Sequence, residues 1–157
     1  MSQANKTLDG NMTAKEAQVR YAMSTPVISV NVDATADDAM SAMIDNEISG
    51  LPVIDSDGRL VGVITEYDVL RMSRETTSHE RPLRSCREVM TKESVTICPD
   101  ASLHEATAIL LKTHFRRLMV VEDDRLIGVL ARRDITRFLR DGQDTQDCLP
   151  WTPLWYD

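Results

Sequence analysis

Short apolar runs and polar turns alternate along this chain, and the same order of runs occurs twice. In the first copy, residues 51–54 and 60–64 are apolar and flank a polar turn that contains Asp57-Gly58. Asp-Gly between two apolar runs is typical of a β-hairpin. In the second copy, residues 118–121 and 126–129 repeat the arrangement around a turn that is one residue shorter. The pattern therefore predicts two β-hairpins.

Helical patterns lie before and after each hairpin. Thr35 begins a capping box, and Gly50 is expected to end the helix that follows. Residues 66–72 predict the second helix of this copy, and the second copy has the same signals at Ser102 and in residues 135–139. In the first helix the apolar positions recur at helical spacing, at Ala36, Ala39, Met40, Met43 and Ile44.

An extended segment opens each copy. Residues 27–30 are rich in β-branched side chains and favour a strand, and residues 95–97 are their counterpart. Capping boxes that begin at Thr13 and Ser85 predict short helices ahead of these strands, the first of them reaching about Ala22. The predicted order in each copy is β-α-β-β-α.

The two copies are offset by 67 residues before the hairpin turn and by 66 after it. A unit this short buries its apolar face against its twin, because it is too small for a core of its own. Two similar halves then enclose two similar clefts. We expect five segments along the chain: a tail with the start of the leading helix (1–18), repeat 1 (19–72), a linker (73–85), repeat 2 (86–140) and an aromatic tail (141–157).

Composition and charge exclude several classes of function. Apolar residues make up 42% of the 157 residues, and the net charge is −7. An acidic protein without a basic face is a poor binder of DNA and of anionic membranes. No apolar run approaches the ~20 residues that cross a bilayer, and the N-terminal segment is polar, unlike a signal peptide. We expect a soluble protein of the cytoplasm.

Residues that bind metals or act as nucleophiles are few and scattered. Cys86, Cys98 and Cys148 form no C-x-x-C pair, and the three histidines are equally far apart. A thiol in such a chain is far more often buried or idle than catalytic. A hydrolase built on Cys86 or His114 lacks an assembled base, nucleophile and oxyanion donor. The sequence therefore predicts no metal site, no catalytic residue and no enzyme activity.

Residues 51–55 and 60–68 resemble the cystathionine-β-synthase (CBS) domain, and residues 117–121 and 128–134 resemble it again. The resemblance implies an α/β (α+β) fold of two β-α-β-β-α repeats, packed sheet to sheet with pseudo-twofold symmetry as a Bateman module. Such pairs commonly form homodimers and bind adenine nucleotides between the repeats. They regulate another protein and perform no chemistry. The resemblance also implies that no cofactor is required and that the regulatory ligand is AMP, ADP, ATP or S-adenosylmethionine.

In this family a carboxylate at the start of the last helix of a repeat holds the ribose of the ligand. An ionised carboxylate can accept two hydrogen bonds from a vicinal diol. Thr65 and Asp68 match the family pattern in full, although they also fit a simple capping box. In the second repeat Ala131 lacks the hydroxyl group, so Asp134 either holds a ribose or only interacts with the helix dipole.

Basic residues distinguish the second repeat from the first. Arg116 and Arg117 stand where the first repeat has Ser49-Gly50, and together with Arg133 they would form a cationic pocket in an acidic protein. Guanidinium groups suit phosphate. The alternative is a solvated edge in which Arg116 and Arg117 pair with Glu122 or Asp123.

The resemblance gives a set of expected ligand residues for each cleft. For the more cationic cleft the set is Asp134, Arg133, Arg116, Arg117, Val129, Pro26, Ile28 and Ile48. The other cleft has little positive charge and is expected to be empty or to take a less charged adenosine compound. Its set is Thr65, Asp68, Tyr67, Val63, Val95 and Phe115.

Two functions from different classes remain in view. The leading one is a non-catalytic module that senses an adenine nucleotide and regulates an unknown partner protein. The alternative is a ligand-free dimeric scaffold that engages a partner through its surface and its C-terminal tail. Trp151, Trp155 and Tyr156 crowd into that tail, which either packs on the protein itself or its dimer partner, or binds a different protein.

Overall fold

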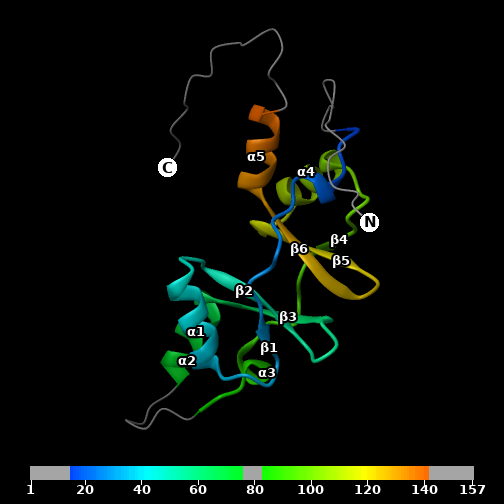
Figure 1. The fold of residues 1–157 in the computed structure, drawn as a ribbon. Helices are drawn as coiled ribbons and strands as arrows, with labels where there is room; N and C mark the ends of the chain where they lie inside the picture. The colour runs from blue at the N-terminus through cyan, green and yellow to red at the C-terminus, as the bar shows by residue number, and fades with distance from the viewer. Residues whose placement is uncertain (1–14, 76–82, 142–157) are drawn as a thin grey trace, which may run out of the picture.

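The computed structural model describes residues 15–75 and 83–141, which form two similar halves (Figure 1). The first half contains β1 (Val30–Asn31), α1 (Ala36–Asp45), β2 (Gly50–Ile54), β3 (Leu60–Thr65) and α2 (Glu66–Glu75). The second contains β4 (Thr96–Ile97), α4 (Leu103–Lys112), β5 (Arg117–Glu122), β6 (Arg125–Ala131) and α5 (Arg132–Asp141). A 3₁₀ helix, η1 (Val19–Tyr21), and a short helix, α3 (Cys86–Val89), precede the halves. The predicted order β-α-β-β-α is confirmed; the aromatic tail and Cys148 lie outside the described residues.

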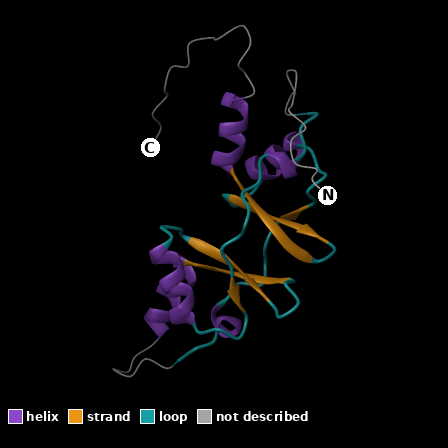
Figure 2. Ribbon diagram, in the orientation of Figure 1, coloured by secondary structure: helices purple, strands orange, loops and turns teal. Residues whose placement is uncertain are grey.

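Each half is a three-stranded sheet with two helices. The strand orders are β1-β2-β3 and β4-β5-β6, and in each sheet the first pair is parallel and the second antiparallel. Both hairpins contain a register shift at the same place, after Val53 and after Val120. The sheets lie in the middle of the molecule with the main helices outside (Figure 2). The expected α/β (α+β) fold with sheet-to-sheet packing is confirmed.

The two hairpin turns differ by one residue, as the sequence predicts. Between β2 and β3, Gly58 takes a φ of 79°, which costs glycine little because it has no Cβ. Between β5 and β6, Asp123 and Asp124 have φ of 50° and 63°. Two successive positive φ values characterise the type I′ turn, whose twist matches that of a hairpin.

The predicted end of α1 at Gly50 is wrong. The helix ends at Asp45, and Gly50 is the first residue of β2. Glu47 takes the left-handed conformation with a φ of 52°, its N–H bonds to the carbonyl of Ile44, and the N–H of Ile48 bonds to the carbonyl of Met43. This is a Schellman motif with glutamate in the position that glycine usually occupies.

The leading helix and the first strand are also shorter than predicted. The capping box at Ser85 does form, but in the described part of the leading segment, residues 15–22, the only helix is a three-residue 3₁₀ helix. The backbone N–H groups of Val19 and Arg20 bond to carbonyls of Ala101 and Pro99 instead of to their own helix. Residues 27–29 lie outside β1, which is only two residues long. Long-range bonds override the local helical signal here.

The halves exchange segments to complete their cores. Ala17 and Val19 are fully buried in the cluster formed by the second half, and Cys86 is fully buried in the cluster of the first half. Val89 packs with Ala36 of α1. The packing units therefore differ from the expected ranges 19–72 and 86–140 at η1 and α3.

The main helices are uniform and short. Each of α1, α2, α4 and α5 has ten residues. Within residues 15–75 and 83–141, no helix has both the length and the apolar character needed to cross a membrane.

The exchanged segments pass close to a glycine in each hairpin, and this contact yields a prediction. A Cβ on Gly62 would lie 2.8 Å from the carbonyl oxygen of Thr91, a backbone atom, and 2.7 Å from Sδ of Met90. A Cβ on Gly128 would meet only the flexible side chain of Met23 among its three nearest atoms. We expect Gly62→Ala to lower the free energy of unfolding by about 1–3 kcal/mol, and Gly128→Ala to lower it less. Urea denaturation of both variants checks this, and equal losses would contradict it.

Candidate functional site

Asp134 is held at the start of α5 by contacts from both halves. The backbone N–H of Ala131 donates to its Oδ2 over 2.7 Å, and Oγ of Ser24 donates to its Oδ1 over 3.3 Å. Arg137 lies 3.8 Å from Oδ1. The Asp134 side chain is 8% exposed and lines a cleft between the halves. Its Oδ2 is therefore held by a short hydrogen bond, whereas its Oδ1 makes only longer contacts.

The cleft beside Asp134 has a volume of about 620 Å³ and gathers residues from both halves. All eight residues that the sequence analysis assigned to the cationic cleft line it: Asp134, Arg133, Arg116, Arg117, Val129, Pro26, Ile28 and Ile48. One side is apolar and comes mainly from the first half, while the basic side chains come from the second. A flat apolar group and an anionic group could both find contacts here.

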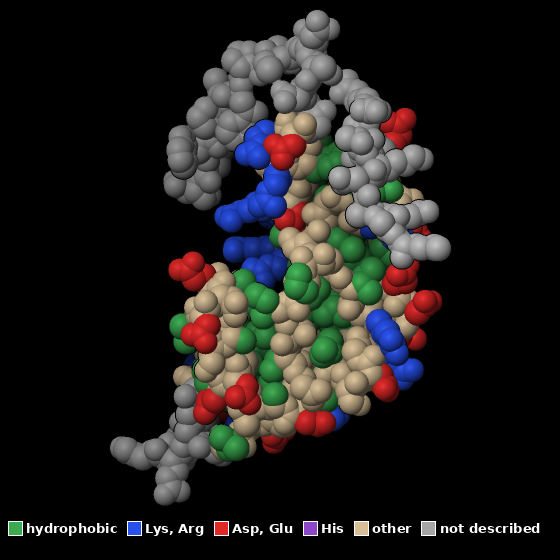
Figure 3. Space-filling view, in the orientation of Figure 1, with side chains coloured by type: hydrophobic (Ala, Val, Ile, Leu, Met, Phe, Trp, Pro, Cys, Tyr) green, Lys and Arg blue, Asp and Glu red, His purple; other side chains and the backbone are tan. Residues whose placement is uncertain are grey.

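Positive charge dominates this cleft. Five arginines line it against two carboxylates, Glu47 and Asp134, and Lys and Arg side chains gather beside α5 where the halves meet (Figure 3). Among the described residues, no carboxylate lies within ion-pair distance of Arg116 or Arg133. Among the ion pairs of the described residues, neither Glu122 nor Asp123 pairs with Arg116 or Arg117, so the alternative of a paired basic edge is not found; Glu122 lies 3.9 Å from Arg20 instead.

Arg117 connects the halves. Its Nη1 donates to the carbonyl of Gly50 over 3.0 Å, and its Nη2 donates to Oγ of Ser49 over 3.1 Å. Ser49 and Gly50 occupy the positions in the first repeat that Arg116 and Arg117 occupy in the second. Arg117 also lines both clefts between the halves. It is therefore a tie between the repeats at the boundary of the two clefts.

The second cleft lacks its expected carboxylate. It has a volume of about 440 Å³ and includes Thr65, Tyr67, Val63, Val95 and Phe115 in its wall. Asp68, which the sequence analysis also assigned to it, lies behind the wall and is 2% exposed.

Internal hydrogen bonds explain why Asp68 is withdrawn. One oxygen accepts from the backbone N–H and the hydroxyl of Thr65, each over 2.9 Å. The other accepts from the hydroxyl of Thr91 over 2.9 Å and from Arg71 over 3.4 Å. Asp134 lacks the hydroxyl from its own repeat, because Ala131 has none, and its bond to Ser24 is longer. Asp68 and Asp134 therefore occupy equivalent positions, but Asp68 accepts more hydrogen bonds than Asp134 does.

Sequence reasoning missed several residues of the Asp134 cleft. Arg132 and Arg137 line it from α5, and Glu47 lines it because of the Schellman motif at the end of α1. Ser24 was also missed, although a signal existed, since Ser24 and Thr91 are 67 residues apart and both carry a hydroxyl group. Their equivalence becomes visible only once each is seen beside a carboxylate.

Of the two cysteines that the structure describes, Cys86 is buried and Cys98 is exposed. Cys86 is fully buried, and its Sγ donates to the carbonyl of Thr35 over 3.3 Å. Burial raises the pKa of the Cys86 thiol to about 11. Among the described residues, no group of three or more His, Cys, Asp and Glu side chains could hold a metal ion.

Comparison with known proteins identifies the fold. A family model described as the CBS domain matches residues 14–75 and 86–141. This chain belongs to the CBS domain family. CBS domain-containing protein YhcV of Bacillus subtilis is 30% identical over 76% of this chain and 83% of its own length. Inosine-5'-monophosphate dehydrogenase of Methanocaldococcus jannaschii is 35% identical over 77% of this chain.

Solved CBS pairs share the arrangement of the two halves. The crystal structure of CBSX2 in complex with AMP is similar with a TM-score of 0.70 and 31% identity, covering 79% of this chain and 96% of that one. The CBS pair of MJ0100 in complex with 5′-methylthioadenosine and S-adenosyl-L-methionine has a TM-score of 0.66 and 25% identity, covering 78% and 99%. Several curated relatives are longer: the chain spans 23% of the M. jannaschii dehydrogenase, 21% of its Nitrosopumilus maritimus counterpart and 57% of CBSX1 from Arabidopsis thaliana.

The burial of Cys86 yields a prediction about thiol reactivity. The thiolate is the reactive form, and a pKa near 11 in place of 9 leaves about a hundredfold less of it at neutral pH. In a Cys148→Ser background, we expect 5,5′-dithiobis(2-nitrobenzoic acid) to modify the exposed Cys98 readily and Cys86 only after denaturation. A Cys98→Ser control should abolish the fast phase. Two fast thiols in the native protein would contradict the burial.

Proposed function

We propose that this protein is a non-catalytic regulatory module that binds an adenine nucleotide in the Asp134 cleft. The observation that carries the proposal is the composition of that cleft. An oriented carboxylate, arginines without a carboxylate partner and an apolar wall from the opposite repeat line one hollow of about 620 Å³. These are the groups that recognise a ribose, a phosphate and a base, respectively.

The relatives support adenine as the base. CBSX2 was crystallised with AMP, and the CBS pair of MJ0100 with two adenosine compounds. Pro26, Ile28 and Ile48 offer a flat group apolar contacts opposite Val129. Asp134 at the start of α5 would accept hydrogen bonds from the ribose hydroxyls. The Ser24 hydroxyl can rotate away from Asp134, because their bond is long and replaceable.

The number of arginines favours a ligand with more than one phosphate. Arg117 is bonded to the first repeat, and Arg132 donates to the carbonyl of Leu110. Arg116 and Arg133 remain for anionic groups, Arg137 lies at the cleft 3.8 Å from Asp134, and the first turn of α5 faces the same cleft. A monophosphate would use only part of this charge. We therefore propose ADP or ATP ahead of AMP.

Arg117 provides a route from binding to regulation. Its guanidinium group donates to a neutral carbonyl and a hydroxyl of the first repeat. A phosphate in the cleft would offer charged acceptors, which form stronger hydrogen bonds with guanidinium. Ligand binding would then release Ser49 and Gly50 and favour a different packing of the repeats, which is a population shift.

The remaining features of the proposal concern assembly and surroundings. We propose that the protein is a cytoplasmic homodimer that regulates a partner protein. The second cleft, with Asp68 withdrawn, would take at most a ligand of lower charge. Its remaining residues could contact an adenosine compound without phosphate.

The charge of the cleft predicts an order of affinities. We expect isothermal titration calorimetry to give affinities that rise from adenosine through AMP to ADP and ATP, because each phosphate adds contacts to Arg116, Arg133 and Arg137. AMP should bind at least about tenfold more tightly than adenosine. The affinity gained with each added phosphate should be smaller at high salt, because salt screens the attraction between the arginines and the phosphates. Failure of every nucleotide to bind at millimolar concentration would overturn the proposed function and leave the scaffold alternative.

Variants locate the site. We expect Asp134→Asn and Arg133→Gln each to weaken ATP binding about tenfold or more, since each removes a charge-assisted hydrogen bond from the cleft. Arg125→Gln is the matched control, because Arg125 is exposed on the second hairpin away from the cleft. Unchanged affinity in both cleft variants would place the ligand elsewhere, whereas an equal loss in Arg125→Gln would indicate only a general charge effect.

A further inference from the structure

The second cleft between the halves has aromatic and apolar walls, although its carboxylate is withdrawn. Tyr67 and Phe115 line it with 72% and 40% of their surfaces exposed. Val95 and Met119 add apolar surface to the same wall. Exposed aromatic rings around a hollow of about 440 Å³ are suited to stacking with a flat aromatic group. The cleft therefore offers contacts to such a group without the carboxylate that would hold a ribose.

The charge of this cleft favours a ligand with some negative charge. Arg116 and Arg117 line it beside His114, and among the described residues of its wall the one carboxylate is Glu66. Guanidinium groups attract carboxylates as well as phosphates. A segment that combines aromatic rings with a few carboxylates would therefore match both features of the cleft.

The segment that follows α5 has this combination. Residues 142–157 lie outside the described residues, and their sequence contains both tryptophans of the chain, three aspartates and neither Lys nor Arg. Pro150 and Pro153 stand on either side of Trp151 with the spacing P-x-x-P, which favours an extended polyproline conformation. Segments with this spacing bind grooves that are lined by aromatic side chains.

The length of this segment allows it to reach the second cleft of its own chain. At the start of α5, the backbone N–H of Arg132 donates to the carbonyl of Arg116, a residue of the cleft wall, over 3.3 Å. From there the ten residues of α5 extend for about 15 Å. Residues 142–151 span up to about 33 Å when extended, so Trp151 can return along the whole length of α5.

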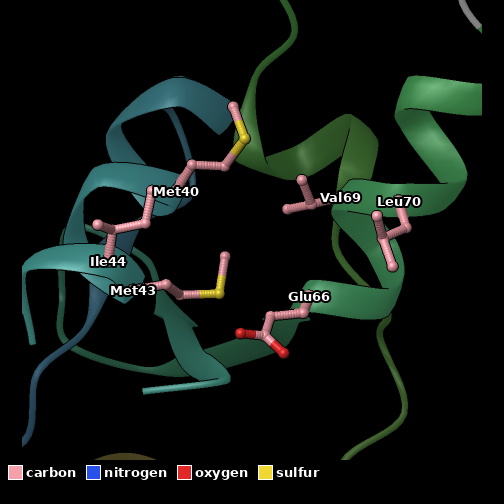
Figure 4. A pocket seen from close by; sticks show the side chains of 6 residues that line it. All are labelled: Met40, Met43, Ile44, Glu66, Val69 and Leu70. Atoms are coloured by element: carbon pink, nitrogen blue, oxygen red, sulfur yellow. The ribbon is translucent and has the colours of Figure 1, made fainter. Parts of the chain in front are cut away.

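Another apolar hollow, the groove between α1 and α2, matches the segment less well. It has a volume of about 300 Å³, and its apolar lining consists of Met40, Met43, Ile44, Val69 and Leu70 (Figure 4). Its charged lining residue is Glu66, which would repel the aspartates of the segment. Among the described residues that line this groove, none is aromatic or basic.

We propose that residues 150–155 occupy the second cleft of the same chain, with Trp151 packed against Tyr67 and Phe115. The aspartates of the segment then lie on the side of Arg116 and Arg117. The segment takes the place of a small-molecule ligand, so an adenosine compound must displace it to enter. One cleft is then available to a nucleotide, while the protein itself closes the other.

The two tryptophans allow a direct test, because all tryptophan fluorescence of the protein comes from this segment. We expect the native protein to emit at shorter wavelength than the urea-unfolded chain, since an indole in the cleft is shielded from water. Tyr67→Ala and Phe115→Ala each shift the emission to longer wavelength and increase its quenching by acrylamide. Both side chains are exposed, so circular dichroism remains unchanged. Native emission and quenching equal to those of the unfolded chain would overturn the proposal.

Matched variants test the position of the segment. Tyr21→Ala removes an aromatic side chain that is 55% exposed on η1, and Leu70→Ala alters the groove between α1 and α2; both leave the fluorescence unchanged. A shift in either control equal to that of Phe115→Ala would overturn the proposal. Emission that changes on dilution would show binding to another copy and overturn the assignment to the same chain. ATP titration of the same samples reports separately on the Asp134 cleft.

Discussion

The exchange of the short segments η1 and α3 is the constraint on which the rest of the structure depends. Val19 completes the core of the second half, and Cys86 completes that of the first. Neither half can bury its apolar face without a part of the chain that leads into the other. The exchange also brings Ser24 and Thr91 beside the carboxylates of the opposite halves. The exchange of segments therefore completes both cores and also places a hydroxyl group beside each of the two carboxylates.

The two repeats share one fold, and the few positions at which their residues differ determine the chemistry of the two clefts. Where the first repeat has Ser49-Gly50, the second has Arg116-Arg117, and this difference supplies both the cationic cleft and the tie between the halves. Ala131 in place of Thr65 leaves Asp134 less engaged than Asp68. Since the backbone is shared, each such difference changes charge or hydrogen bonding without changing the fold. One cleft thus gains positive charge, while the carboxylate beside the other is engaged in internal hydrogen bonds.

The sequence predicted those features that depend on hydrogen bonds between residues close together in the chain. The capping boxes at Thr35 and Ser102 and both hairpins are present because their hydrogen bonds join neighbouring residues. The extent of η1 could not be predicted, because its N–H groups bond to carbonyls about 80 residues away. The lining of the Asp134 cleft followed from the repeat and the family pattern. The withdrawal of Asp68 did not, since it depends on a hydroxyl that arrives from the exchanged segment.

Helix α5 links the Asp134 cleft to the outer surface of the second half. Its first turn carries Arg133 and Asp134 into the cleft, and its last turns expose Leu139 beside Arg140 on the outer face. A ten-residue helix moves as a rigid unit about 15 Å long. A ligand that moves the first turn of α5 would therefore also move the surface around Leu139. By linkage, a partner that binds this surface would change nucleotide affinity by the same factor as the nucleotide changes the affinity for that partner.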